Sequence, residues 1–481
     1  MKLQIVGFTI GILPIILGLA EMVPAIMDLP ADGGHADAFM TSSFLSLFFG
    51  GTLYLANRAG KNTITVKETF ILTTLSWFFI SFFASLPLYF SNLDLSFTDA
   101  IFETVSGIST TGSTVLTGLD EMSHGILIWR SIIQWIGGIG IIGFALVFLP
   151  FLKIGGMQLF KTESSDQSDK SMPRAVQIAK SVLIAYVLLT CFFGIVYHLL
   201  GMSTFDAVNH AMTTIATAGY STHDASYGYF DSYALDMAAT LFMIMSGLPF
   251  ILYVNMVFQR RFAFFRDEQV KAFLIIMAAF IVILTGWLWE HSEYTLAQSF
   301  RYVAFNISSV VSTCGYATTD YIQWGSFSWV FFLFATYLGA CAGSTSGGLK
   351  IMRIVVCLKA LGKQIHQMIY PHGVFTICYQ GHPLSDIVTR SVFGFLGLYV
   401  TANAFFTILL TWTGVDFISA ISGVATSFSN TGPGVGNLIG PAGNFASLPD
   451  AAKWILCLCM LLGRLEIITV LVLFTRLFWR R

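Results

Sequence analysis

Charge is scarce in this sequence. Only 11% of its 481 residues are Asp, Glu, Lys or Arg, and 55% are hydrophobic, whereas about 25% of the residues of soluble proteins are charged. This balance excludes an ordinary soluble domain and predicts an integral membrane protein. The formal net charge of −1 gives no support to nucleic-acid binding, and in a membrane protein the informative quantity is where the charges fall along the chain.

Motifs for metal, nucleotide or nucleophilic chemistry are also missing. The seven cysteines show no CxxC pair and no Cys/His spacing that suits zinc, and the nine histidines form no HExxH motif. No glycine-rich string follows the GxxxxGK(S/T) pattern of nucleotide binding. The sequence therefore shows no reactive cluster that would indicate an enzyme. We expect the cysteines to be unpaired packing residues: Cys191, Cys314, Cys341, Cys357, Cys378, Cys457 and Cys459.

Long apolar runs are what the sequence has instead. Crossing a hydrocarbon core of about 30 Å takes about 20 helical residues. The first run is expected to be a retained span rather than a signal peptide, because it is long and lacks a clear cleavage site. The ten expected spans are Leu3–Met27, Phe39–Ala56, Thr69–Phe90, Gly125–Leu152, Ile178–Leu200, Tyr233–Phe258, Ala272–Trp289, Phe327–Leu358, Ile387–Trp412 and Ala451–Phe478.

Basic residues fall almost entirely on one side of these ten spans. All but four of the 25 Lys and Arg residues lie in segments that share that side, the exceptions being Arg130, Arg301, Lys453 and Arg464. Lys and Arg accumulate in the cytoplasmic loops of membrane proteins. Both termini are therefore expected to be cytoplasmic.

A short Thr/Gly string recurs four times along the chain, each time after an apolar segment that is too short to span a membrane. This pattern predicts four repeated units of helix, half-helix, string and helix. Asp99 and Asp206 stand at the start of their half-helices, where we interpret them as caps. The strings cover residues 109–114, 216–221, 312–317 and 429–434, and their central glycines are Gly112, Gly219, Gly315 and Gly432.

Four such strings around one axis would line a pore, because non-helical backbone at membrane depth must be buried in protein or face water. Glycine permits positive φ, which lets a string turn its carbonyl groups towards a dehydrated cation. A single string would be interpreted as a contact between packed helices, but four in register favour the pore. The expected cation ligands are Thr110, Thr111, Gly112, Thr217, Ala218, Gly219, Thr313, Cys314, Gly315, Asn430, Thr431 and Gly432.

Longer motifs make the chain similar to the Trk/Ktr/HKT superfamily of potassium transporters, and most of all to its TrkH/TrkG branch. They are Ser106–Gly112, Trp129–Gly138, Ser312–Tyr316, Gly343–Gly348 and Gly463–Glu466. The resemblance covers essentially the whole chain and implies four pore units, one pore per subunit and a homodimer. Each string centres on one glycine and the four strings differ, so we expect modest selectivity against sodium and permeability to rubidium.

Residues 339–348 interrupt the eighth span with small residues that hold a helix poorly. Composition alone leaves close helix packing and an intramembrane loop open, and the resemblance favours a gate loop below the filter. Arg464 lies near the middle of the last span, where a charge usually faces a cavity or a partner. The resemblance implies that it bonds a loop carbonyl or repels cations, and an ion pair with another helix is the alternative. The expected gate residues are Gly339, Gly343, Ser344, Thr345, Ser346, Gly347, Gly348, Lys350 and Arg464.

The expected fold is an all-α integral membrane protein with ten transmembrane helices and four re-entrant pore-helix hairpins. These form four pseudo-fourfold repeats around one pore, after an extra N-terminal helical hairpin. We interpret Glu103 and Arg130 as scaffold around the filter. The expected boundaries are 1–60 for the hairpin and 61–165, 166–262, 263–375 and 376–481 for the repeats.

The expected function is potassium uptake through a gated, channel-like pore, with K⁺ as the transported ion and no tightly bound cofactor. The resemblance implies a bacterial inner-membrane location and a cytosolic nucleotide-binding ring of the TrkA type, on which ATP, ADP or NAD would act. A secondary transporter coupled to H⁺ or Na⁺ is the alternative. That class predicts inverted halves and about two interrupted helices, whereas the four units here run in the same direction.

Overall fold

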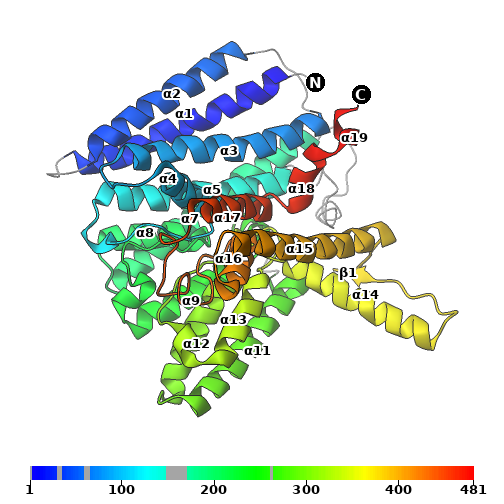
Figure 1. Cartoon of the computed structure of the whole chain (residues 1–481). Helices are drawn as coiled ribbons and strands as arrows, with labels where there is room; N and C mark the ends of the chain where they lie inside the picture. The colour runs from blue at the N-terminus through cyan, green and yellow to red at the C-terminus, as the bar shows by residue number, and fades with distance from the viewer. Residues whose placement is uncertain (1–2, 30–34, 59–64, 148–170, 261–263, 481) are drawn as a thin grey trace.

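The computed structural model describes residues 3–29, 35–58, 65–147, 171–260 and 264–480 (Figure 1). The end of the fourth expected span, 148–152, and most of the basic stretch 153–180 lie outside the described residues. Within the described residues the chain is mainly helical, as predicted. An antiparallel pair of two-residue strands that the sequence did not predict, β1 (Cys378–Tyr379) and β2 (His382–Pro383), forms the one sheet in this part of the chain.

The leading hairpin consists of α1 (Leu3–Asp28) and α2 (Ala36–Ala56), which lie together at one edge of the molecule beside α3 (Figure 1). Small residues let the two helices approach closely. The hydroxyl of Ser43 donates to the carbonyl of Gly18 at 2.6 Å, and a Cβ added at Gly11 would lie 2.6 Å from the backbone nitrogen of Tyr54. The extra hairpin is thus present as predicted.

Four units follow the hairpin, each with a short helix between longer ones. The first contains α3 (Val66–Phe90), α4 (Phe97–Ile108) and α5 (His124–Val147). The second contains α7 (Ser171–Leu199), α8 (Thr204–Ile215), α9 (Tyr233–Ser246) and α10 (Phe250–Gln259). The third contains α11 (Glu268–His291), α12 (Leu296–Val311), α13 (Ser326–Tyr337) and α14 (Ile351–Ile369). The fourth contains α15 (Asp386–Trp412), α16 (Phe417–Ser429), α17 (Asp450–Arg464), α18 (Ile467–Leu471) and α19 (Arg476–Trp479).

Single turns of 3₁₀-helix occur in the connections. They are η1 (Leu119–Glu121), η3 (Ser226–Phe230), η4 (Phe264–Arg266), η5 (Tyr321–Trp324) and η6 (Val472–Phe474). Three of them, η1, η3 and η5, follow a string and lead towards the next long helix. They lie on the face where the half-helices begin, since Thr222, beyond the second string, donates to the carboxylate of Asp206 at the start of α8 at 2.7 Å. We call this side of the molecule the mouth face.

The four short segments predicted before the strings are the half-helices α4, α8, α12 and α16. Each begins after a polar residue whose side chain accepts a hydrogen bond from the first turn: Ser96, Ser203, Thr295 and Asp416. The prediction that Asp99 and Asp206 are the caps is therefore wrong. Each aspartate lies three residues after the capping serine and accepts a hydrogen bond from its hydroxyl at 2.7 Å.

Two of the expected spans are bent rather than straight. α9 and α10 meet at 94°, and α17 and α18 meet at 105°. The first bend precedes Pro249, which has no backbone N–H to continue a helix. At the second, Glu466 has a φ of 60°, which is outside the helical region. Hydropathy did not predict these breaks because both arms of each pair are apolar.

The expected span 327–358 is divided into α13 and α14 by the non-helical segment 338–350, as its small residues predicted. In the described part of the chain, seven helices are long and apolar enough to cross a membrane, or nine if each bent pair counts as one span. The predicted interruption of the eighth span is thus observed, whereas the predicted count of ten transmembrane helices is not confirmed. The divided and bent helices supply the non-helical backbone that surrounds the centre of the molecule.

Burial separates the half-helices from the long helices. Every residue from Ala100 to Ile108 on α4 is buried, whereas Phe44 and Leu199 on long helices are 67% and 76% exposed. Apolar surface of this kind is what a helix presents to lipid. The half-helices and strings therefore form the protein-buried centre. All seven cysteines are unpaired, as predicted, but Cys191 and Cys378 are exposed and so do not pack in the interior as expected.

Candidate cation-binding site

The four strings adopt the same backbone conformation at equivalent positions. The residue two before each central glycine has φ between 49° and 61°, and each glycine has φ between 74° and 107°. Positive φ costs about 1–2 kcal/mol for a residue that carries a Cβ, so packing must hold the non-glycine residues in place. These residues are Thr110, Thr217, Thr313 and Asn430, and the glycines are Gly112, Gly219, Gly315 and Gly432.

Backbone N–H groups of the strings donate to their own half-helices. The residue before each glycine donates to the carbonyl five residues earlier at 2.8–3.0 Å, in the pairs Thr111 to Ser106, Ala218 to Thr213, Cys314 to Ser309 and Thr431 to Thr426. Among the described residues, the carbonyl groups of Thr110, Thr217, Thr313 and Asn430 accept no hydrogen bond from a backbone N–H. Free carbonyls and the negative ends of four half-helix dipoles make the centre suitable for a cation.

The strings meet in a closed cyclic order. A Cβ added at each central glycine would meet the carbonyl oxygen that precedes the glycine of another unit. The distances are 2.2 Å from Gly112 to Ala218, 2.0 Å from Gly219 to Cys314, 2.1 Å from Gly315 to Thr431 and 2.9 Å from Gly432 to Thr111. The fourth contact returns to the first unit, so the predicted repeats close into one ring.

Tyrosine follows the central glycine in the second and third strings and reaches the preceding unit. The hydroxyl of Tyr220 donates to the carbonyl of Glu103 at 2.7 Å. The hydroxyl of Tyr316 forms a hydrogen bond with the hydroxyl of Thr213. Both tyrosines are buried. They join the first unit to the second and the second unit to the third behind the strings.

The other two junctions lack such a tyrosine. Ser113 occupies the position in the first string, and its hydroxyl donates to the carbonyl of Gly432 at 2.9 Å. In the fourth string the residue is Pro433, whose Cδ would lie 3.2 Å from a Cβ on Gly315. The junction between the fourth and first units therefore has the smallest sealing side chain and the widest glycine contact.

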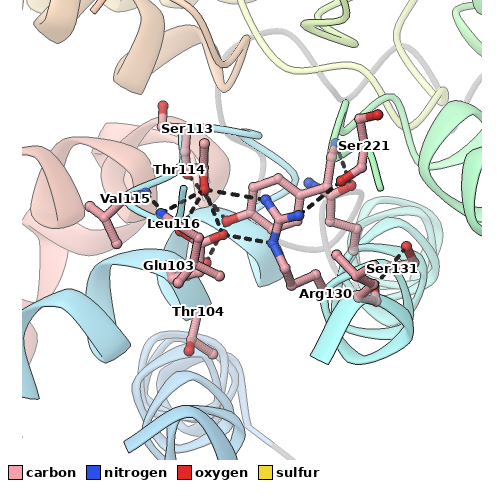
Figure 2. A network of polar contacts seen from close by, with 12 residues as sticks. Glu103, Thr104, Ser113, Thr114, Val115, Leu116, Arg130, Ser131 and Ser221 are labelled. Atoms are coloured by element: carbon pink, nitrogen blue, oxygen red, sulfur yellow. Dashed lines mark hydrogen bonds and ion pairs between the residues drawn. The ribbon is translucent and has the colours of Figure 1, made fainter. Parts of the chain in front are cut away.

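A buried ion pair supports the first string (Figure 2). Glu103 accepts from Nε of Arg130 at 2.9 Å, and the two side chains are 0% and 1% exposed. The same carboxylate accepts from the hydroxyl of Thr114 at 3.0 Å and from the backbone N–H of Val115 at 2.9 Å. Arg130 also donates to the carbonyl of Ser221 at 2.9 Å. The pair thus connects the ends of two strings, which agrees with the scaffold position expected for it.

Gln134 on α5 braces the second string. Its Nε2 donates to the carbonyl of Ala218 at 2.8 Å, and its Oε1 accepts from the backbone N–H of Tyr220 at 3.1 Å. The sequence analysis gave Gln134 no role of its own, although it lies in the 129–138 motif. The signal was a polar residue inside an apolar span, where polar side chains usually have a specific partner.

The loop 338–350 lies directly against the ends of three half-helices. The hydroxyl of Thr345 donates to the carbonyl of Ile215 at 3.0 Å. The backbone N–H of Gly347 donates to the hydroxyl of Thr313 at 2.7 Å. A Cβ at Gly347 would lie 2.1 Å from the carbonyl oxygen of Ser429. The loop therefore covers the end of the ring opposite the mouth face at the second, third and fourth units.

The break between α9 and α10 anchors the other edge of this loop. The backbone N–H of Cys341 donates to the carbonyl of Gly247 at 3.1 Å, and that of Phe250 donates to the carbonyl of Gly343 at 2.9 Å. Both partners on the second unit are free for these bonds because the helix is interrupted there. The unpredicted bend thus has a clear structural use, since it holds the loop in position.

Arg464 contacts the loop as the sequence predicted. The side chain is 4% exposed, and Nη1 donates to the carbonyl of Thr345 at 2.9 Å. In the part of the chain that the structure describes, Arg464 takes part in no ion pair, so the alternative of a structural ion pair is not observed. Lys350 donates to the carbonyl of Ser346. Arg464, Lys350 and Arg353 line one cavity beside the loop, together with a single carboxylate, Glu466.

Arg353 is a residue that the sequence analysis placed only among the basic residues that set topology. It forms an ion pair with Glu466 at 2.6 Å, and its guanidinium carbon lies 3.7 Å from the centre of the Phe395 ring. The pair joins the first turn of α14 to the break between α17 and α18. Its sequence signal was weak, because the two residues lie 113 positions apart. The loop is therefore fixed to the fourth unit at both Arg464 and Glu466.

The whole chain is similar to known transport proteins. The family model TrkH, described as a cation transport protein, matches residues 35–479. The Trk system potassium uptake protein TrkI of Halomonas elongata is 45% identical over 474 residues, which are 98% of this chain and 96% of that protein. The Trk system potassium uptake protein TrkH of Escherichia coli K12 is 36% identical over 98% of both chains.

A solved structure agrees with these relatives. The crystal structure of the potassium transporter TrkH from Vibrio parahaemolyticus superposes with a TM-score of 0.92 at 34% identity, covering 100% of both chains. The relatives are membrane transport proteins rather than enzymes, as the sequence led us to expect. Full-length coverage at this identity decides the family. This chain belongs to the TrkH family of cation transport proteins.

Proposed function

We propose that this chain is a potassium uptake protein in which the four strings form a K⁺ filter and loop 338–350 forms the gate. The observation that carries the proposal is the closed ring of four glycine contacts, because it brings carbonyl groups from four units to one centre. Carbonyl oxygens can replace the hydration shell of a monovalent cation. The choice of K⁺ follows the printed names of the relatives.

The filter ligands that we propose are the string residues named above as expected cation ligands: Thr110, Thr111, Gly112, Thr217, Ala218, Gly219, Thr313, Cys314, Gly315, Asn430, Thr431 and Gly432. Their side chains differ from unit to unit, so the ring has no exact fourfold symmetry. Selection against sodium is therefore modest, and rubidium permeates. K⁺ crosses as the transported substrate rather than as a resident cofactor.

The gate that we propose consists of Gly339, Gly343, Ser344, Thr345, Ser346, Gly347, Gly348 and Lys350 with Arg464. The loop closes the path because its backbone lies against three half-helix ends. Arg464 and Lys350 add positive charge at the same place, which raises the energy of a cation there. Opening then requires the loop to leave Thr313 and Ile215 and to break its bond to Arg464.

The proposed orientation places the mouth face outside a bacterial inner membrane and both termini in the cytoplasm, because the Lys and Arg residues concentrate on the opposite side. Ten crossings result if each bent pair counts as one crossing and α13 with α14 as another. The repeat boundaries 61–165, 166–262, 263–375 and 376–481 follow from this count, after the hairpin 1–60.

The partners that we propose are a second copy of the chain and a cytosolic nucleotide-binding ring of the TrkA type. The printed names of the relatives refer to a Trk system, which supports a multi-component assembly. Basic cytoplasmic segments, including the end of α14, offer a surface for the ring. ATP, ADP or NAD then acts on the partner, since this sequence has no P-loop motif of the GxxxxGK(S/T) type.

Passive conduction fits the pore better than coupling to H⁺ or Na⁺. An H⁺-coupled transporter needs ionisable groups that release and take up protons within the membrane. The broken-helix class, which includes Na⁺-coupled transporters, predicts about two interrupted helices in inverted halves rather than four units in the same direction. Two carboxylates that a buried proton relay could use, Glu103 and Glu466, are each paired with an arginine. Such pairs occupy the carboxylates, so they favour a structural role.

Growth and flux test the proposal. A bacterium that lacks its potassium uptake systems should grow at low external potassium when it produces this chain with a cognate ring partner. Vesicles that contain the chain should take up Rb⁺ down its gradient, with uptake unchanged by a pH or Na⁺ gradient. No rescue together with no Rb⁺ uptake would reject potassium uptake, and uptake that required a pH or Na⁺ gradient would reject passive conduction.

A further inference from the structure

His223 lies between two carboxylates at the mouth face, where the first and second units meet. Its Nδ1 is 2.5 Å from Oδ1 of Asp120, and its Nε2 is 3.5 Å from Oδ1 of Asp206. The imidazole is 13% exposed, Asp206 is 14% exposed and Asp120 is 44% exposed. The ring is therefore shielded but can be reached by protons from solvent past Asp120.

The hydrogen-bond pattern of this pocket is incomplete for a neutral histidine. When Nδ1 donates to Asp120, a neutral ring leaves Nε2 as an acceptor that faces the oxygen of Asp206. Nε2 has no hydrogen-bond partner among the described residues. A proton on Nε2 would turn this contact between two acceptors into an ion pair. The positions of both carboxylates thus suit the imidazolium form.

The other titratable and aromatic groups around His223 have partners of their own or stack on the ring. Asp224 lies beside it and accepts from the backbone N–H of Leu119 at 3.1 Å, while the Tyr229 ring stacks on the imidazole at 3.4 Å. His210 is bonded to Ser221 and to its own helix.

Asp206 remains a carboxylate over the range in which histidines titrate. Partial burial raises the pKa of Asp206, but hydrogen bonds from Ser203 and Thr222, together with the two nearby histidines, hold it below its ordinary value. A depressed carboxyl pKa contributes stability above the ordinary pKa of aspartate, and this contribution is lost only in strong acid. Asp206 can therefore pair as a carboxylate with an imidazolium and accept a hydrogen bond from its Nε2–H.

The pocket is connected to two of the four strings. His223 lies just beyond the second string, four residues after Gly219. Asp120 belongs to η1, which follows the first string. A second bond between the same segments runs from the backbone N–H of Asp224 to Asp120 at 3.3 Å. A proton bound at His223 would thus strengthen the contact between the two string ends and remove one negative charge from the mouth face.

We propose that His223, held between Asp120 and Asp206, is a proton-binding site at the external mouth of the pore. Protonation tightens the junction between the first and second units and weakens the attraction of the mouth for cations. External acid therefore lowers inward flux and stabilises the fold. This inference depends on the proposed pore function for its effect on flux, but its effect on stability does not.

Rb⁺ uptake into vesicles tests the site, with the external pH varied between 8 and 5.5 and the internal pH held constant. Histidine is the side chain that ordinarily changes charge in this range. Wild-type uptake should fall roughly twofold to fivefold as one added charge acts on the mouth. His223→Gln should lose this dependence, and His223→Arg should hold uptake low at every pH. His291→Gln is the matched control, because His291 is an exposed histidine on the same side that bonds only to its own helix.

Thermal unfolding of the purified chain in detergent provides a readout without transport. The wild type and His291→Gln should unfold about 2 °C or more higher at pH 6 than at pH 8, and His223→Gln should lose the part of this shift that comes from the pocket. A His223→Gln variant with the wild-type pH profile of both uptake and unfolding would overturn the site. A shift in unfolding without Rb⁺ uptake at any pH would reject the pore while keeping the proton site. Uptake that followed internal instead of external pH would also overturn the proposal.

Discussion

The junction between the second and third units and the junction between the fourth and first units perform the same geometric task with different residues. At the former, a Cβ on Gly219 would lie 2.0 Å from the next carbonyl, and Tyr316 seals the contact. At the latter, the corresponding distance from Gly432 is 2.9 Å, and Ser113 provides the seal. The ring therefore consists of closely packed junctions and one looser closing junction.

The difference between the two junctions shows how one chain can form a ring from unequal repeats. The φ angles and the hydrogen bonds to the half-helices are shared by all four strings, so backbone geometry is the common element. Side chains behind the strings differ, and they set how tightly neighbours meet. Variation in this surrounding layer is the physical reason to expect an asymmetric filter.

Arg130→Ala should have the largest effect on stability, because it removes the ion pair that supports the closely packed junction between the first and second units. Loss of one partner from a buried ion pair leaves Glu103 charged and unpaired, at a cost of about 3–5 kcal/mol. We expect a large fall in folded protein and in melting temperature in detergent. Lys363→Ala is the control, since its partner Asp386 is 76% exposed, and such a pair contributes about 0–1 kcal/mol. Equal stability of the two variants would contradict the account.

Gly219→Ala and Gly432→Ala compare a tight junction with the loose one directly. Both place a Cβ at positive φ, at a cost of about 1–2 kcal/mol. The added Cβ would lie 2.0 Å from a backbone carbonyl oxygen in Gly219→Ala and 2.9 Å in Gly432→Ala, so Gly219→Ala has the more severe overlap, worth about 1–3 kcal/mol more. Rb⁺ uptake should fall at least about tenfold for Gly219→Ala and less for Gly432→Ala. Gly397→Ala, at a helical position with open space around it, should have wild-type uptake. A reversed order would show that the ring contacts do not set function.

Arg464→Ala tests whether the side of the ring opposite the mouth is held shut by the loop. The substitution removes a charged hydrogen bond to Thr345, worth about 1.5–3 kcal/mol, and a positive charge from the cavity. Rb⁺ uptake without the ring partner should rise by about tenfold. Arg464→Lys keeps the charge and should leak less. Unchanged flux in Arg464→Ala would reject its role in the gate.

Tyr316→Phe and Ser113→Ala should produce the smallest effects. Tyr316→Phe removes the hydroxyl that bonds to Thr213, Thr214 and the carbonyl of His210. Ser113→Ala removes the single hydroxyl bond to Gly432, and each such bond contributes about 1 kcal/mol. Tyr316→Phe keeps the packed aromatic ring that seals its junction, whereas Ser113→Ala leaves only a methyl group at the looser junction. We therefore expect the ratio of Rb⁺ to Na⁺ uptake to fall more in Ser113→Ala. Competition between the two ions in vesicles measures this ratio. An equal fall of this ratio in both variants, or a larger fall in Tyr316→Phe, would show that the looser junction does not affect ion selection.

Sequence patterns predicted the features that local chemistry determines. The four half-helices, the positive-φ glycines and the loop 338–350 follow from segment length and from residues that only certain conformations accept. The charge of Arg464 within a span indicated a partner or a cavity, and the family resemblance, rather than the charge itself, implied the contact with a loop carbonyl that is observed.

Other features depended on contacts between distant segments and could not be predicted. The breaks before Pro249 and at Glu466 lie between apolar arms that hydropathy joins into one span. Arg353 meets Glu466, and His223 meets Asp120, only when the units close into a ring. No periodicity in the sequence encodes such pairs, and the residues that seal the junctions, Tyr220 and Tyr316, were therefore missed as well.

Anomalous diffraction from crystals of the protein grown with Rb⁺ is the most direct test of the central claim that the four strings form one cation site. The account predicts an Rb⁺ peak enclosed by the four strings, close to the carbonyl groups of Thr110, Thr217, Thr313 and Asn430. The peak should weaken in Gly219→Ala. Rb⁺ bound elsewhere in the molecule, with none between the strings, would contradict the account.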